Sequence, residues 1–171
     1  AALAAAEMVD SSGIDLLHGI IAGYDVANSI AEAINPHHYD WWHTTATVGF
    51  LGASTSSAVL MGLSSEQTSH ALATSGTMAA GLQQAFRADA MSKPIHSGRA
   101  AEGGVLSALL AKNGVTGALD ILEGERGFGN AMSVNVDWKK AVDELDDNDS
   151  ITKITLKNHA ACGHVHAIID A

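Results

Sequence analysis

The chain has 171 residues, of which 47% are hydrophobic and only 16% are charged, and its formal net charge is −10. Nine Lys and Arg residues are too few for the continuous basic surface that nucleic acids require, so this composition excludes a nucleic-acid partner. The negative charge would also repel an anionic substrate, so a carboxylate site must gather its cations locally. A charged fraction below the roughly 25% of an average globular protein predicts that much of the surface is covered by a partner or by further chain.

Cys162 is the only cysteine, which excludes an intramolecular disulfide and favours a reducing, cytoplasmic compartment. The alanine-rich residues 1–9 are too short to span a membrane and lack the basic region of a signal peptide. We therefore expect no membrane partner. Both ends of the chain stop within a helical pattern, so we expect it to be an internal piece of a longer protein.

Capping residues and small-residue patterns predict a mostly helical chain. Ser12, with Asp15 in the first turn, opens an amphipathic helix over residues 14–34 that ends at Asn35-Pro36. After a polar and aromatic loop, a second helix is expected over 44–61. Its Ala, Gly, Ser and Thr residues let other helices approach closely, so it should be central and buried.

Further helices follow the second one. The capping-box pattern of residues 64–67 predicts a helix over 66–87. Lys93-Pro94 breaks the chain before a helix over 97–112. Thr116 is a suitable N-cap for a short helix that reaches Leu122.

The last part of the chain differs in character. The glycine-rich segment 124–129 is a flexible connection, because it lacks the preceding strand and the Gly-Lys-Ser/Thr ending of a phosphate loop. A short helix then ends in the acidic run 146–149, and the β-branched residues of 151–157 predict a strand. We therefore expect a mainly α protein, with an all-helical domain over 1–136 and the start of an α/β domain over 137–171.

Two histidines, His43 and His96, stand about fifty residues apart at the start of helices rich in small residues. The start of a helix attracts anions and lowers the pKa of a histidine, which keeps the ring neutral and able to act as a base. His43 also follows two tryptophans, and a base between aromatic walls suits proton abstraction. A histidine that only packs between loop and core is the alternative.

The segment around His96 offers several groups for binding a carboxylate. Lys93 supplies a cation, Ser97 a hydroxyl, and the start of the helix free backbone amides. Gly98 would let a ligand approach the backbone closely. A solvated loop whose histidine caps the helix is the alternative.

Lys157, at the end of the predicted strand, could clamp a carboxylate, although an ordinary exposed lysine fits the sequence equally well. The nearby His159, Cys162, His164 and His166 are of the types that bind zinc. In a helix, however, His164 and His166 would project about 200° apart, so they cannot share one ion. We expect no metal site.

Short segments spread in order over nearly the whole chain form a specific set. They are Trp42-His43-Thr44-Thr45-Ala46-Thr47-Val48-Gly49, Leu60-Met61-Gly62-Leu63 with Glu66-Gln67, Ala71-Leu72, Lys93-Pro94-Ile95-His96-Ser97-Gly98-Arg99-Ala100-Ala101, Leu122-Glu123-Gly124 with Gly127-Phe128, Lys157, Cys162, His166 and Ile169-Asp170-Ala171. This set resembles the MmgE/PrpD family, which includes 2-methylcitrate dehydratase, cis-aconitate decarboxylase and iminodisuccinate epimerase.

The resemblance implies an all-helical domain followed by a smaller α/β lid, with the active site between them, no metal or organic cofactor, and usually a homodimer. It implies a lyase or isomerase that removes the α-proton of a small di- or tricarboxylic acid, leading to dehydration, decarboxylation or epimerisation. Catalytic roles then map onto His43, Lys93 and Lys157. The substrate would also meet the segment of His96, Ser97 and Gly98, and His166.

Members of the family are considerably longer than this chain. An upstream histidine and an acidic residue of the family's site have no counterpart here, and most of the lid is absent. We therefore expect the isolated chain to be inactive. A non-catalytic helical module for binding or assembly is the alternative function.

Overall fold

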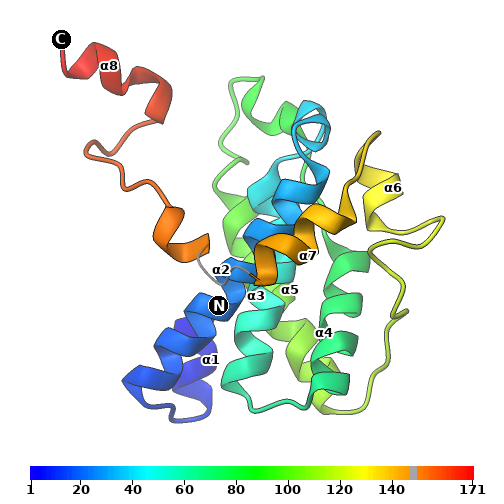
Figure 1. Ribbon diagram of the computed structural model, residues 1–171. Coiled ribbons are helices and arrows are strands. Elements are labelled where there is room, and N and C mark those ends of the chain that lie inside the picture. Colours follow the sequence, from blue (N-terminus) through cyan, green and yellow to red (C-terminus); the bar gives the residue numbers. More distant parts are fainter. Residues whose placement is uncertain (147–149) are drawn as a thin grey trace.

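The computed structural model describes residues 1–146 and 150–171 and is mainly α-helical, as the sequence predicts (Figure 1). Its centre is made of α2 (Gly13–Ile34), α3 (Thr44–Leu60) and α5 (Ile95–Lys112). α3 packs against both α2 and α5.

Shorter helices surround this centre. α4 (Ser65–Met78) packs against α3 and α5, and α1 (Ala2–Met8) packs against α2 and α3. α7 (Trp138–Asp146) lies along α2. None of the helices in the described part of the chain is both long and apolar enough to cross a membrane.

α3 is the buried, central helix that its small residues predict. A Cβ atom added to Gly52 of α3 would lie 2.8 Å from the carbonyl oxygen of Gly23 in α2. A Cβ atom added to Gly23 would likewise lie 2.8 Å from the carbonyl oxygen of Gly52. On the side of α5, a Cβ atom on Gly104 would lie 2.6 Å from the backbone nitrogen of Ser54. α3 therefore touches two neighbouring helices almost backbone to backbone, which only residues without a side chain permit.

Two helix starts follow their capping signals closely. The Ser12 hydroxyl accepts a hydrogen bond from the backbone N–H of Asp15 at 3.2 Å, so α2 begins as predicted. Before α4, Ser64 and Gln67 form the reciprocal capping box, with bonds of 3.2 and 3.0 Å. α5 begins at Ile95, two residues earlier than predicted, so its first turn contains His96.

The helix predicted over 66–87 is too long, because α4 ends at Met78. The chain turns out of the helix at Ala79, whose backbone is extended, and forms only a short 3₁₀ turn, η2 (Gln83–Phe86). In this stretch the backbone bonds across to residues 41–43 instead of along a helix. Tertiary pairing thus outweighs the local helix propensity.

The short helix predicted over 116–122 is also wrong, since residues 116–118 have no regular structure and residues 119–122 form turns. Gly117 is pressed against α4, where an added Cβ atom would lie 2.7 Å from that of Ala73. Its N–H also donates to the ring of His70 at 3.3 Å, so contact with α4 determines this backbone. Helix α6 (Phe128–Met132), at the end of the glycine-rich segment, was not predicted.

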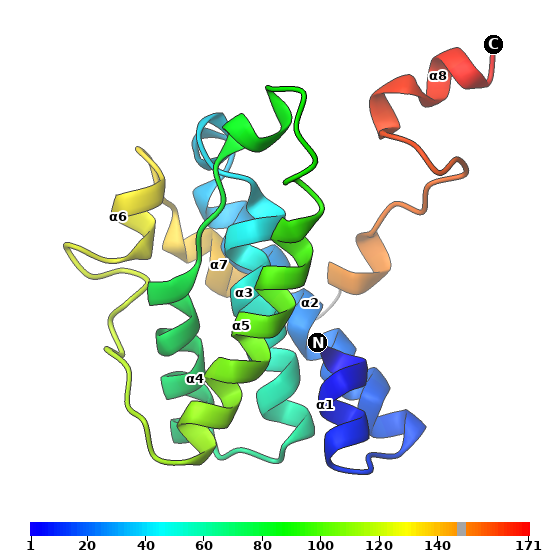
Figure 2. The same ribbon diagram turned by 180° about the vertical axis from the view of Figure 1, so that it is seen from behind.

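No strand forms over 151–157, and elsewhere in the described residues the β-structure is an isolated bridge between Trp42 and Leu82. A strand needs a neighbouring strand to bond with, and the described chain places none beside this segment. It begins as a 3₁₀ turn, η3 (Ser150–Lys153), on α2 and leads to η4 (Gly163–Val165) and α8 (His166–Ile169). Residues 154–171 project from the helical bundle in Figures 1 and 2.

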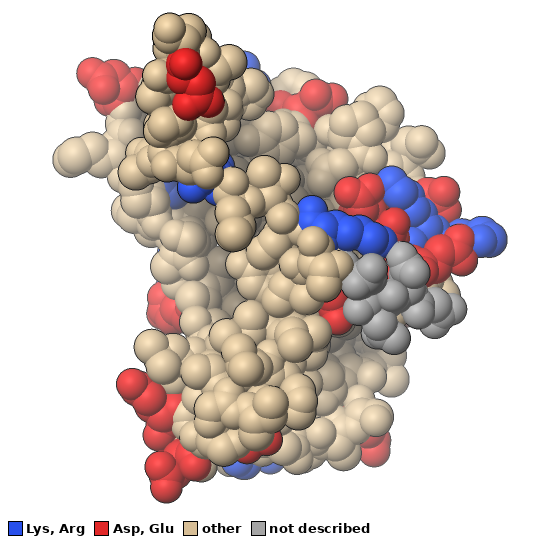
Figure 3. All heavy atoms as spheres, turned by 60° about the vertical axis from the view of Figure 1, so that its left-hand side comes forward, with Lys and Arg blue, Asp and Glu red and all other residues tan. Residues whose placement is uncertain are grey.

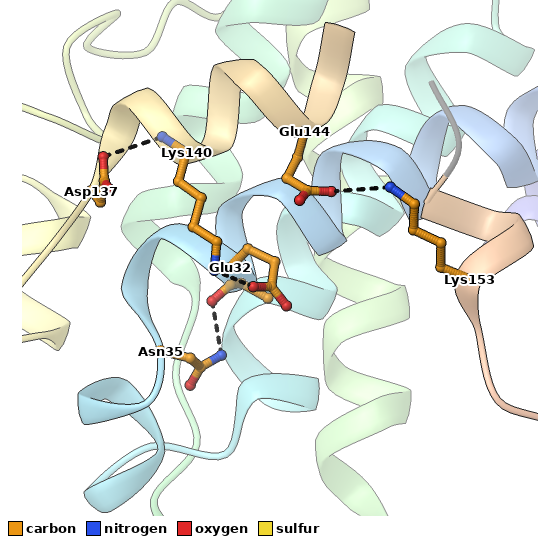
Figure 4. A network of polar contacts seen from close by, with 7 residues as sticks. Glu32, Asn35, Asp137, Lys140, Glu144 and Lys153 are labelled. Carbon is orange, nitrogen blue, oxygen red and sulfur yellow. Dashed lines mark hydrogen bonds and ion pairs between the residues drawn. The ribbon is translucent and has the colours of Figure 1, made fainter. Parts of the chain in front are cut away.

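The domain division at residue 136 stays a prediction. Of the acidic run expected to end the preceding helix, residues 147–149 lie outside the described residues. Two ion pairs join α7 to its neighbours (Figure 4). Lys140 pairs with Glu32 of α2, and Glu144 pairs with Lys153 of η3 at 3.8 Å. Elsewhere on the face shown in Figure 3 most of the surface is uncharged, in line with the low charged fraction.

Two glycine substitutions in α5 test the close packing of α3 and α5. Gly104→Ala places a methyl group against the backbone of α3, which cannot give way, so we expect it to destabilise the protein by about 1–3 kcal/mol. Gly98→Ala is the matched control, because nothing lies within 4 Å of its added Cβ atom. It should be neutral or stabilise by up to about 1 kcal/mol. Equal urea midpoints for the two variants would contradict the close approach of the helices.

Candidate active site

His43 and His96 lie side by side at one end of the helical bundle. His43 is the residue before α3, and His96 is the second residue of α5. Their Nδ1 atoms are 2.8 Å apart and their ring centroids 5.1 Å apart. In this hydrogen bond one Nδ1 donates a proton and the other accepts it, so the bond requires that at least one of the two rings be neutral.

An aromatic side chain and a cation complete this group. The ring of Phe86, in η2, meets the ring of His43 edge-on, with centroids 4.9 Å apart. On the same phenyl ring lies the ammonium group of Lys93, 4.7 Å from the centroid, in a cation–π contact. The structure therefore brings together His43, His96 and Lys93, three of the residues that the sequence singles out.

The half-buried His43 has a lowered pKa. Burial is the largest cause, followed by the positive charges of His96 and Lys93. We expected the start of the helix to be the cause, so the physical reason differs although the direction agrees. A ring with a lowered pKa stays neutral to lower pH and is available to accept a proton.

The backbone around His43 is held by the segment between α4 and α5. The N–H of His43 donates to the carbonyl of Gly81 at 2.9 Å, and the N–H of Gln83 donates to the carbonyl of Trp41 at 2.9 Å. Because residues 79–87 are predicted as part of a long helix, the sequence does not predict this pairing or the contacts of Gln83 and Phe86 with the loop and with His43. Gly81, a helix-weakening residue within that predicted helix, was a weak signal against it, since Gly76 is of the same type and stays within α4.

A second histidine in the preceding loop, His38, is fully buried. Its Nδ1 lies 3.1 Å from the carbonyl oxygen of Met132, and its Nε2 lies 2.8 Å from the Thr47 hydroxyl. Since a carbonyl only accepts, Nδ1 carries the proton and Nε2 accepts one from Thr47. Burial lowers the pKa of His38, which keeps it neutral. His38 thus ties the loop before His43 to α3 and α6 and does not face a substrate.

The other groups predicted at the start of α5 are exposed. The Ser97 hydroxyl donates to the carbonyl of Pro94 at 3.0 Å, and Gly98 faces open space. The amides of Ile95 and His96 already donate to carbonyls of the preceding turn, both at 3.1 Å. These two amides are therefore not free for an anion.

A surface hollow of about 490 Å³ borders the ring of His96. Trp42 and Leu82 form part of its apolar wall, and Arg99, one turn after His96 on α5, supplies a cation at its edge. Arg99 also forms an ion pair with Glu102. The hollow is large enough for a small molecule with both apolar and anionic parts.

Lys157 and His166 lie in the projecting segment 154–171, so the structure does not bring them to His43. Lys157 is exposed, and the ring of His166 packs on that of His159 with centroids 5.1 Å apart. His159 in turn pairs with Asp170 at 2.7 Å. Among the residues that the structure describes, no three His, Cys, Asp or Glu side chains are grouped to hold a metal ion.

The Lys93→Ala variant tests the electrostatics of the site. Removing this cation should raise the pKa of His43, because the imidazolium form is then less disfavoured. NMR titration of the His43 ring protons measures the change. Lys112→Ala, at the far end of α5, is the control and should leave the titration unchanged. A pKa that stays constant or falls in Lys93→Ala would contradict the described arrangement.

Sequence comparisons show which known proteins this chain is similar to. The family profile described as MmgE/PrpD N-terminal domain matches residues 1–141. The chain is 27% identical over 169 residues to the cis-aconitate decarboxylase-like protein oryM of Aspergillus oryzae (strain ATCC 42149 / RIB 40). This alignment covers 94% of this chain and 35% of that protein. It is 35% identical over 123 residues to the cis-aconitate decarboxylase of Homo sapiens, covering 69% of this chain and 24% of that protein.

The chain thus spans about a third or less of the length of these curated relatives. The family profile, by contrast, covers more than three quarters of the chain. The chain therefore belongs to the MmgE/PrpD family.

Proposed function

We propose that the protein containing this chain is a lyase or isomerase that removes the α-proton of a small di- or tricarboxylic acid without a cofactor. The observation that carries the proposal is the half-buried His43, with its lowered pKa, bonded to His96 and close to Lys93. A neutral base beside a cation is what removal of a proton next to a carboxylate requires.

The bond to His96 gives His43 a defined role. When the Nδ1–H of His43 donates to His96, the lone pair of His43 lies on Nε2 and is free to accept a proton. The lowered pKa keeps this nitrogen unprotonated but also makes it a weaker base. Cations that stabilise the product of proton removal must therefore supply part of the driving force.

Lys93 is the first of these cations in our proposal. Taking the α-proton leaves an electron pair that spreads onto the neighbouring carboxylate, which then carries additional negative charge. An ammonium group near that carboxylate lowers the free energy of this intermediate. In our proposal Lys157 serves a second carboxylate once its segment folds back over the bundle, and Ser97, Gly98 and His166 contact the substrate there.

The names of the two relatives favour one outcome of the shared step. Both refer to cis-aconitate decarboxylase, which makes a tricarboxylate the first substrate to test and decarboxylation the first reaction. In decarboxylation the loss of CO2 leaves the electron pair, and the protonated form of the base returns a proton to that carbon, whereas dehydration and epimerisation begin with removal of the proton by the neutral base. The hollow beside His96 supports an acid of this size, because its volume is about 490 Å³ and Arg99 at its edge supplies a cation for a carboxylate.

A homodimer and a cytoplasmic location stay predictions for the complete protein. The row Ile14, Leu17, Ile21 and Tyr24 on one face of α2 is exposed in this chain, which is consistent with a covered surface in the dimer. Sedimentation velocity of the complete protein would decide between monomer and dimer.

Isotope exchange tests the proposed function without assuming the final product. In heavy water the complete protein should incorporate deuterium at the α-carbon of at least one di- or tricarboxylate from a panel that includes cis-aconitate. His43→Gln should reduce the exchange rate by about 10²–10⁴-fold, the usual contribution of a general base. His18→Gln, at an exposed position of α2, is the control and should leave the rate unchanged.

Two results would count against the proposal. If the folded complete protein catalyses no exchange with any acid of the panel, the non-catalytic binding or assembly module is the better account. If exchange occurs but His43→Gln retains nearly the full rate, another residue is the base.

A further inference from the structure

Gln83, in the segment between α4 and α5, is buried, with 4% of its surface exposed. Its Nε2 lies 2.7 Å from the carbonyl oxygen of Tyr39 and 3.4 Å from that of Trp42. Both partners are acceptors, so the amide nitrogen must face them and the orientation of the side chain is determined. Gln83 thus donates two hydrogen bonds to the loop that immediately precedes His43.

The other end of the same side chain has no such partner. Oε1 of Gln83 is buried without a hydrogen bond in the described protein. A buried acceptor without a partner destabilises the fold, and an apolar side chain of similar length would fill the space without this defect. What the glutamine adds over such a side chain is the pair of bonds to the loop.

The longer of those bonds acts on the peptide unit that joins Trp42 to His43, whereas the shorter one holds the carbonyl of Tyr39, earlier in the same loop. The N–H of this unit donates to the carbonyl of Gly81 at 2.9 Å, while its carbonyl faces Nε2 of Gln83 at 3.4 Å. The peptide is therefore held from both sides by one short segment, Gly81 to Gln83. Its orientation sets the direction in which the His43 side chain leaves the backbone.

The same segment also limits the position of the partner ring. A Cβ atom on Gly81 would lie 3.4 Å from Nδ1 of His96 and 2.2 Å from the Cβ atom of Ala46, so the backbone at Gly81 lies directly against both. The 2.8 Å contact between the two Nδ1 atoms thus forms where this segment meets both the loop and α5.

We propose that Gln83 is a positioning residue for His43, which holds the Trp42–His43 peptide so that the two histidine rings meet. Gln83 itself does not contact the substrate. Its importance for catalysis rests on the proposed function, whereas its effect on the geometry of His43 does not.

The test compares Gln83→Met with Gln84→Met. Methionine keeps the length of the side chain but cannot donate, and the neighbouring Gln84 is exposed and bonds to neither carbonyl, which makes it the matched control. In Gln83→Met the His43 ring should be less confined and more solvated, so its pKa should rise towards the usual histidine value of about 6.5. NMR titration of His43, with His96 and Lys93 unchanged, should show this rise only in Gln83→Met.

Exchange kinetics of the complete protein give a second measurement. In Gln83→Met we expect kcat for α-proton exchange to fall about 10- to 100-fold, as misplacement of a base does, with little change in KM. Gln84→Met should match the wild type. If wild-type protein shows no exchange, the proposed function fails, but the titration of His43 still decides the role of Gln83.

The proposal is overturned if His43 titrates identically in wild type and folded Gln83→Met. If Gln83→Met does not fold, the side-chain amide protons of the wild-type protein decide. Protection of the Gln83 amide from solvent exchange, together with a through-bond NMR coupling to the carbonyl carbon of Tyr39 or Trp42, would support it. A Gln83 amide that exchanges as fast as that of Gln84 would overturn it.

Discussion

The close approach of α3 and α5 is the constraint on which the candidate site depends. Gly103 and Gly104 of α5 face α3 so closely that an added Cβ atom would lie 1.9 Å from the ring of Phe50 or 2.4 Å from the Cβ atom of Ala53. Both helices begin at the same end of the bundle (Figure 2). Residues at their starts are therefore neighbours, which is how His43 and His96 come within hydrogen-bond distance although 53 positions separate them.

The site also depends on the segment after α4, which is not helical although the sequence predicts a helix up to residue 87. Within residues 79–94, Gly81 and Gln83 bond to the loop before α3, and the same segment supplies the aromatic contact of Phe86 and the cation of Lys93. A continued α4 would satisfy the same backbone groups but would carry these side chains away from His43. Local propensity thus favours a helix in this segment, whereas the contacts around His43 require a non-helical backbone, and the tertiary contacts determine the observed structure.

Local signals in the sequence were sufficient for much of the fold. The caps at Ser12 and Ser64 and the small residues of the second long helix predict α2, α3 and the start of α4, because each depends on residues close together in the chain. The predictions failed where distant contacts determine the backbone. Gly117 packs on α4 where a helix was expected, and residues 151–157 have no strand beside them in the described chain.

In the candidate site, too, features that depend on neighbouring residues could be predicted, whereas features that depend on distant contacts could not. His43, His96 and Lys93 could be singled out because each stands beside a helix start, but the contact between His43 and His96 follows from the pairing of α3 with α5. Gln83 and His38 were missed as supports of the loop, since their hydrogen bonds reach residues that no local pattern connects to them. Lys157 was singled out at the end of a predicted strand that does not form, and His166 by family resemblance, so the roles of both stay part of the proposal.

The most direct test of the account is the protonation state of the two rings that meet at Nδ1. Nitrogen-15 NMR of the histidine rings, above the usual histidine pKa of about 6.5, distinguishes protonated from unprotonated ring nitrogens. We expect one Nδ1 of the His43–His96 pair to carry a proton and the other to carry none, with a hydrogen bond between them. If both rings carry their proton on Nε2, or if both are imidazolium at that pH, the described pair does not exist and His43 loses its place as the base.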